Sequence, residues 1–225
     1  MNENSLIKLI ELRISDSKPG YVFSAIDYTH IAELNTIHQI LSRLEKDGKI
    51  KRVMQGLYYV PRFSELLQEY EEPSPNEIAL AIARKNRWSI VPEGNTALNQ
   101  LGLSTQVSAK WSYISSGPYA EFSYKNIAIE FKHRTTKQIS DMSYKTSLLI
   151  QALKSLGKDN ISTEDLSKLS ERYTADEKET NIFYEKTINK TTITNTFNIP
   201  EELIVEVIIK VGISSTSIIP NSIPP

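Results

Sequence analysis

Three side chains at regular four-residue spacing, Asn35, Gln39 and Arg43, carry groups that pair well with the edges of DNA bases. Asn and Gln can bond adenine bidentately, and Arg can bond guanine in the same way. The apolar residues among them recur at the i, i+3, i+4, i+7 spacing of one helix face: Ile37, Ile40, Leu41 and Leu44. The sequence therefore predicts a helix that buries one face and presents base-reading side chains on the other.

A local basic run follows this predicted helix. Residues 43–62 hold six Lys or Arg against two acidic residues, although the whole chain has a formal net charge of −1. Lysines on the solvated side of an ordinary hairpin would give the same local charge, so the charge alone does not distinguish such a hairpin from a DNA-binding surface. Joined to the helix, however, the basic run favours contact with phosphates. The candidate DNA-contacting residues are Asn35, Thr36, His38, Gln39, Ser42, Arg43, Lys46, Lys49, Lys51, Arg52 and Gln55.

Short elements must position these residues. Asn35-Thr36 is predicted to cap the helix, and Gly48 to end it in the left-handed conformation. Two β-prone runs, 50–54 and 57–60, flank Gln55-Gly56, which is typical of a tight hairpin. Upstream, a first helix is expected to end before Pro19-Gly20, and Ser24 to cap a second helix ending near Leu34. This order predicts a winged helix-turn-helix.

The rest of the chain predicts a second domain. Four glutamates and two prolines in residues 63–75 indicate a junction. We expect a DNA-binding domain at 1–63, an acidic linker at 64–75, an α/β domain at 76–211 and a flexible tail at 212–225. Within the second domain, helices are predicted at 76–87, 95–101, 143–156, 163–172 and 201–211, and strands at 88–91, 110–115 and 122–132. The predicted fold class is α+β, a winged helix followed by a mixed domain with an antiparallel sheet and C-terminal helices.

Composition limits the classes of function. The chain has no apolar run of eighteen residues and no signal-peptide pattern, so we expect a cytoplasmic protein that does not bind a membrane. It lacks cysteine, and its histidines, His30, His38 and His133, have no ligand partners at useful spacing. A zinc site is therefore not expected, and the sequence predicts no metal, cofactor or catalytic residue.

Several segments together resemble the AbiEi-type antitoxins of type IV toxin–antitoxin systems, over about residues 5–160. They are GKIKRVMQGLYYVP, PSPNEIALAIARK, NTALNQLGLSTQVSAKWSYISSG, IEFKHR and LLIQALKSLGK. The most specific part is Leu101 to Val107. The resemblance implies a winged helix that represses its own operon, with own-promoter double-stranded DNA as a partner. It also implies a C-terminal domain that counteracts a cognate nucleotidyltransferase toxin, directly or indirectly.

The chain favours antitoxin over toxin, and it is not expected to be an enzyme. A toxin of that class needs a Gly-Ser pair for nucleotide phosphate, and none of the eight glycines precedes a serine. Two alternatives remain open. One is a ligand-sensing regulator without a toxin, with the 101–107 region lining its pocket. The other is a metal-dependent nuclease built on Glu130-Phe131-Lys132 with Glu121 or Glu93 as the upstream acid. A solvent-facing amphipathic strand explains that tripeptide more simply.

Overall fold

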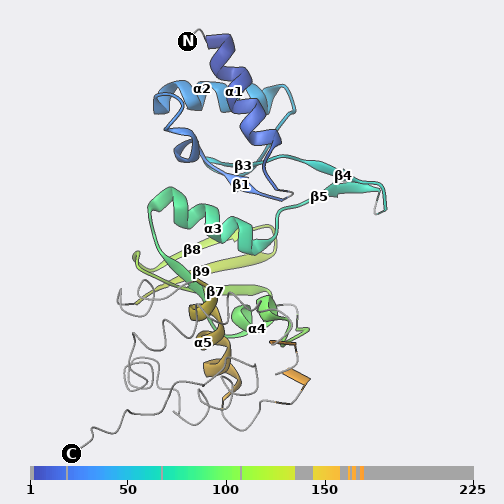
Figure 1. The fold of residues 1–225 in the computed structure, drawn as a ribbon, viewed down its shortest axis with the longest axis vertical. Helices are drawn as coiled ribbons and strands as arrows, with labels where there is room; N and C mark the ends of the chain where they lie inside the picture. Colours follow the sequence, from blue (N-terminus) through green and yellow to red (C-terminus); the bar gives the residue numbers. More distant parts are fainter. Residues whose placement is uncertain are drawn as a thin grey trace, which may run out of the picture. The chain divides into compact units, whose positions relative to one another are not determined.

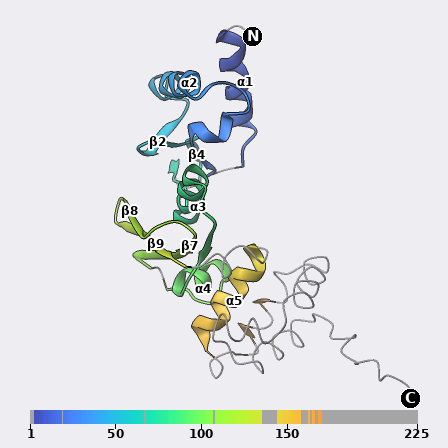
Figure 2. The ribbon, with the colours of Figure 1, turned by 90° about the vertical axis from the view of Figure 1, so that its left-hand side faces the viewer.

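The computed structural model describes residues 3–18, 20–66, 68–106, 108–134 and 144–157, with 162, 164–165 and 168–169. This part of the chain is a mixed α+β protein with antiparallel sheets and helices, as the sequence predicted at that level (Figures 1 and 2). No helix within these ranges is both long enough and apolar enough to cross a bilayer. The predicted helix at 201–211 and the tail lie outside the described residues, as does most of 163–172.

An N-terminal module, residues 3–59, is built on one apolar core. It contains α1 (Glu3–Ser15), β1 (Val22–Phe23), the 3₁₀ helix η1 (Ala25–Tyr28), α2 (Leu34–Lys46), β2 (Lys51–Met54) and β3 (Leu57–Tyr59). Every residue of the predicted apolar stripe of α2 is buried. These side chains join Ile10 of α1 and Phe23 of β1 in a single cluster. The periodicity of α2 therefore predicted its buried face correctly.

The start of α2 differs from the prediction. The helix begins at Leu34 with Glu33 as the N-cap, so Asn35 and Thr36 lie inside the first turn instead of capping it. The Glu33 carbonyl accepts the first helical bond from the Ile37 amide at 3.0 Å. The preceding residues Ile31 and Ala32 pack against the core. Tertiary packing thus fixes the start of this helix without a side-chain cap.

The end of α2 follows the prediction. Gly48 has φ +72°, and its amide donates to the Glu45 carbonyl at 3.0 Å. The next amide, that of Lys49, donates to the Leu44 carbonyl at 3.0 Å. Both bonds belong to a Schellman motif, which requires a left-handed residue at the position of Gly48.

The predicted second helix is much shorter than expected. Ser24 stands at its N-cap, where its amide donates to Asp27 Oδ2 at 2.8 Å, but the 3₁₀ helix ends at Tyr28. The Thr29 hydroxyl then donates to the Ile26 carbonyl at 3.0 Å. Such local side-chain bonds compete with continued helix. The expectation that this helix extends to about Leu34 was therefore wrong.

Three strands close the N-terminal module in the order β1-β3-β2. The tight hairpin predicted around Gln55-Gly56 is present, with Met54 paired to Leu57 and Gly56 at φ +75°. β1 is only two residues long, and the sequence did not indicate it; it pairs antiparallel with the predicted strand β3.

A second hairpin overlaps the predicted acidic linker. β4 (Arg62–Ser64) pairs antiparallel with β5 (Glu69–Glu71), and Phe63 packs edge-on against Tyr70 at 5.4 Å between ring centroids. The position of Phe63 and of Tyr70, each between two polar or charged residues, was the signal for these strands. Acidic composition concealed it.

Helix α3 (Pro75–Asn86) follows, close to the predicted bounds. Ser74 caps it by accepting from the Glu77 amide at 3.2 Å, and Pro75 occupies the first turn, where no amide is needed. α3 contacts β1 and η1 of the N-terminal module and also β9 (Figures 1 and 2). The division at residues 64–75 stays a prediction. The structure adds that α3, which that division assigns to the second domain, packs against the first.

A four-stranded sheet has the strand order β6-β7-β9-β8. Its strands are β6 (Ile90–Pro92), β7 (Lys110–Ser115), β8 (Ala120–Tyr124) and β9 (Ile127–His133). The single strand predicted at 122–132 is instead the antiparallel pair β8–β9. Lys125, at φ +51°, makes the turn that splits it. The apolar alternation changes phase across the turn, from Phe122 and Tyr124 to Ile127 and Ile129, and the single-strand prediction overlooked this change.

The chain forms two compact units. The first holds the described residues up to Ile90 together with 109–111 and 115–133. Among the described residues, the second contains 91–106, 108, 112–114, 134, 144–157, 162, 164–165 and 168–169. In the second unit, α4 (Asn95–Leu101) has the predicted bounds, and Gly102 ends it at φ +72°. α4 packs against α5 (Tyr144–Leu156), which confirms the predicted helix at 143–156.

Candidate nucleic-acid interface

The polar face of α2 is open to solvent. Asn35, His38, Gln39, Arg43 and Lys46 are all exposed. None of their side chains hydrogen-bonds or forms an ion pair with another residue in the described ranges. Because the opposite face of α2 is fully buried, this polar face is held in one orientation while its donors and acceptors stay unoccupied. Thr36 and Ser42 are half-buried at the margin of the face.

The cations of the β2–β3 hairpin already have contacts within the protein. Arg52 pairs bidentately with Glu45 of α2, at 2.9 Å from Nε to Oε1 and 2.6 Å from Nη2 to Oε2. This hydrogen bond raises the pKa of the guanidinium. Lys49 forms an ion pair with Glu11 of α1. Both pairs are partly exposed, so they are worth little to stability. They hold the hairpin against the two helices.

Lys51 contacts an aromatic ring, whereas Lys49 and Arg52 pair with carboxylates. Its Nζ lies 4.1 Å from the centroid of the Tyr70 ring on β5, a cation–π contact that leaves the ammonium exposed. Gln55 is exposed at the hairpin turn. The structure therefore joins the α2 face and the hairpin into one module through Glu45 and Arg52. The Gln55 side chain lies at the tip of that hairpin.

One cation near the candidate interface was missed by sequence reasoning. Lys85 of α3 donates from Nζ to the Gln55 carbonyl at 3.0 Å, so it reaches the tip of the hairpin from thirty residues further along the chain. Its Nζ also lies 2.9 Å from where a Cβ on Gly56 would be. No local pattern could have assigned this residue, because the contact depends on how α3 packs.

The Glu130-Phe131-Lys132 segment has a different environment from the one expected. Glu130 is 6% exposed rather than on a solvent face. Its carboxylate accepts from the Tyr119 hydroxyl at 3.1 Å and pairs with Lys110 Nζ at 3.0 Å. Glu121 stands opposite Glu130 in the β8–β9 register. Among the described residues, no group of three His, Asp or Glu side chains is placed to hold a metal ion.

Residues 101–106, the described part of the most family-like segment, close the C-terminal end of α4. Leu103 donates its amide to the Leu98 carbonyl at 2.9 Å, and Asn99 donates to the Gln106 carbonyl at 2.9 Å. Val107 lies outside the described residues. This segment therefore shapes a helix terminus and the loop after it.

The described part of the molecule defines an α+β protein with a solvent-facing polar helix beside a short basic hairpin. The chain belongs to DUF6088, a family of unknown function whose model matches residues 9–182. No curated protein gives a significant match to the sequence.

Proposed function

We propose that the N-terminal module is a winged helix-turn-helix that binds double-stranded DNA, with α2 as the recognition helix and the β2–β3 hairpin as the wing. The observation that carries the proposal is the α2 face, where five exposed polar side chains have no partner among the described residues. Asn35, Gln39 and Arg43 have the bidentate groups that distinguish base pairs in the major groove. The early start of α2 supports the proposal, because the N-terminal residues of recognition helices contact base edges.

We further propose that the protein is a cytoplasmic antitoxin of a type IV toxin–antitoxin system. In this proposal it represses its own operon and counteracts a nucleotidyltransferase toxin through the part of the chain after residue 75. The support is the resemblance of the quoted segments to AbiEi-type antitoxins, together with the absence of a Gly-Ser pair in the sequence. A ligand-sensing regulator would share the DNA-binding module and lack the toxin partner.

Co-expression with the neighbouring gene tests the antitoxin role. We expect a nucleotidyltransferase-like reading frame beside this gene, growth arrest when it is expressed alone, and recovery when the full chain is co-expressed. A fragment that lacks the N-terminal module is not a suitable substitute, because α3 packs against that module. Growth arrest that the full chain fails to relieve would contradict the antitoxin role and leave the DNA-binding proposal standing.

Base contacts can be tested by discrimination between DNAs. Gln39→Ala or Arg43→Ala is expected to reduce the preference for the promoter over random DNA by roughly 1–3 kcal/mol, the usual worth of one bidentate base contact. Fluorescence anisotropy on both DNAs at one salt concentration measures this preference. Lys154→Ala, an exposed cation on α5, is the control and should change nothing. If both α2 variants keep full discrimination, α2 is not the recognition helix.

Binding to phosphates has a different signature. Replacing Lys46 and Lys51 together by Gln should weaken binding to all sequences, and the slope of log K against log salt should become shallower by about 1 for each phosphate that the protein no longer neutralises. These two cations are chosen because Lys49 and Arg52 also pair with Glu11 and Glu45. A titration series from low to high salt checks the slope. A weaker affinity for the promoter alone would show that these lysines read bases instead.

A further inference from the structure

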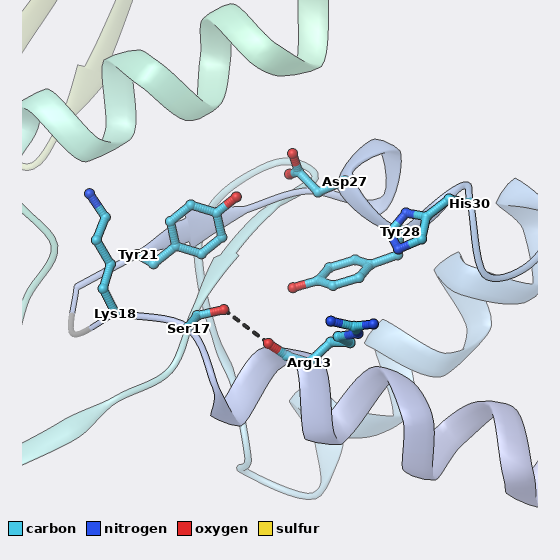
Figure 3. Close-up of a pocket in the computed structure, with 7 residues that line it drawn as sticks. All are labelled: Arg13, Ser17, Lys18, Tyr21, Asp27, Tyr28 and His30. Atoms are coloured by element: carbon cyan, nitrogen blue, oxygen red, sulfur yellow. Dashed lines mark hydrogen bonds between the residues drawn. The ribbon is translucent and has the colours of Figure 1, made fainter.

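A pocket of about 410 Å³ opens in the N-terminal module where α1, η1 and the loop between α1 and β1 meet (Figure 3). Its volume lies in the range typical of small-molecule sites, about 300–1,000 Å³. The residues that line it are Arg13, Ser17, Lys18, Tyr21, Asp27, Tyr28 and His30. None of them belongs to the polar face of α2, so the pocket is separate from the proposed DNA-contacting surface.

Two tyrosine hydroxyls in this pocket have no hydrogen-bond partner among the described residues. Tyr28 is only 5% exposed, yet its hydroxyl points into the pocket, and the hydroxyl of Tyr21 points into the same space (Figure 3). Burial raises the pKa of both phenols, so each is a neutral donor at physiological pH. Each hydroxyl can therefore donate to water or to a bound molecule.

Among the permanently charged side chains that line the pocket, only Arg13 has no partner in the described residues. Both oxygens of Asp27, its only carboxylate, are already bonded, Oδ2 by the Ser24 amide and Oδ1 by Arg84 at 3.1 Å. Lys18 is paired with Glu77 at 2.6 Å. Arg13 and His30 have no side-chain partner in the described ranges, and the Arg13 guanidinium lies beside the Tyr28 ring in Figure 3.

We propose that this pocket binds a small organic anion that combines an aromatic ring with one carboxylate or phosphate group. The anionic group would accept from the Tyr21 and Tyr28 hydroxyls and from Arg13, and the ring would pack against the tyrosine walls. An aromatic carboxylate and a nucleoside monophosphate both have this chemistry. Since η1 also contacts α2, an occupied pocket would brace the element that supports α2.

Isothermal titration of the full chain with benzoate and, separately, with AMP tests the site and distinguishes the two sources. We expect one of these probes to bind, and Arg13→Gln and Tyr28→Phe each to weaken that binding by about tenfold, the effect of losing one hydrogen bond to a charged group. Tyr28→Phe removes only a hydroxyl without a protein partner, so the melting temperature should stay unchanged. Lys8→Gln, which removes an exposed α1 cation outside the pocket, should bind the probe as the wild type does.

Two results would overturn the proposal. One is the absence of heat from both probes at millimolar concentration. The other is binding that neither Arg13→Gln nor Tyr28→Phe weakens. Because the titration contains no DNA, its outcome is independent of whether α2 reads a promoter. The two proposals can therefore fail separately.

Discussion

Replacing Leu41 by alanine is expected to destabilise the N-terminal module by about 2–5 kcal/mol, the usual cost of truncating a buried leucine. Leu41 is fully buried in the cluster that joins α1, β1 and α2. Removing its side chain leaves a cavity at the point where α2 is held, so the polar face loses its fixed orientation. The N-terminal module should unfold at a lower temperature, which circular dichroism measures. Promoter binding should be lost with it, which fluorescence anisotropy measures.

Leu12→Ala is the matched control for this variant. Leu12 is 58% exposed on α1, and the same chemical change there should alter the free energy of unfolding by less than about 0.5 kcal/mol. Equal stability of the two variants would mean that Leu41 does not lie in the core. A stable Leu41→Ala variant that still loses promoter binding would show that Leu41 sets the position of α2 for DNA binding without contributing to the free energy of unfolding.

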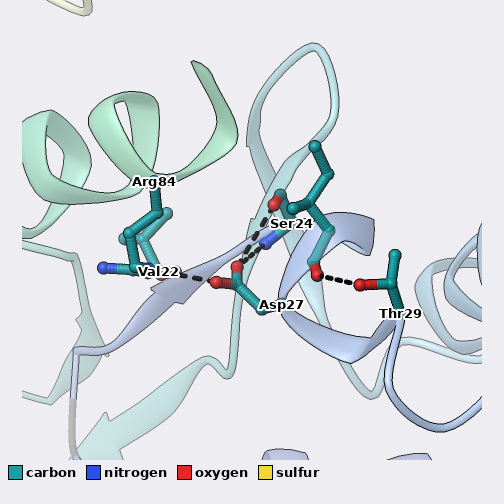
Figure 4. A network of polar contacts seen from close by, with 6 residues as sticks. Val22, Ser24, Asp27, Thr29 and Arg84 are labelled. Atoms are coloured by element: carbon teal, nitrogen blue, oxygen red, sulfur yellow. Dashed lines mark hydrogen bonds and ion pairs between the residues drawn. The ribbon is translucent and has the colours of Figure 1, made fainter. Parts of the chain in front are cut away.

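Arg84→Met is expected to destabilise the first unit by about 1.5–3 kcal/mol, because hydrogen bonds to charged groups have that worth. Arg84 donates to the Val22 carbonyl at 2.5 Å and to Asp27 Oδ1 at 3.1 Å (Figure 4). Its guanidinium also lies 4.8 Å from the centroid of the Tyr21 ring. One side chain of α3 therefore contacts both β1 and η1. Methionine has a similar length but leaves the Asp27 carboxylate and the Val22 carbonyl without this donor.

Chemical denaturation measured by tyrosine and tryptophan fluorescence checks this prediction. Lys8→Met makes a comparable charge change at an exposed position of α1 and should leave the midpoint unchanged. An Arg84→Met variant as stable as the wild type would show that the hydrogen bonds of Arg84 do not stabilise the packing of α3 against the N-terminal module.

Residues 34–59 were the part of the fold that local sequence determined best. The apolar period of α2, the left-handed Gly48 and the turn at Gln55-Gly56 each act within a few residues, so each leaves a local pattern. The same holds for α4 and its terminal Gly102. In these elements the predicted and observed bounds agree to within about two residues.

Two errors in the fold came from local signals that were given too little weight. The second helix stops at Tyr28, where the Thr29 hydroxyl bonds the Ile26 carbonyl, and acidic composition concealed the β4–β5 hairpin. A different limit applies to the candidate site. Sequence named the exposed face of α2, but the partners of Lys49 and Arg52, and the reach of Lys85 to Gln55, depend on tertiary contacts.

The Glu45–Arg52 pair has a consequence for the nucleic acid. It joins α2 to β2 through two parallel hydrogen bonds, and Tyr58 of β3 packs in the same buried cluster as α2, so the bonds and the core together set the position of the hairpin relative to the helix. If α2 and the hairpin contact DNA as proposed, the protein offers one fixed spacing between its groove contacts and its backbone contacts. The duplex must then supply the adjustment by bending or by changing its groove width. Promoters with easily deformed base steps between the two contacts would bind more tightly, even at positions that no side chain touches.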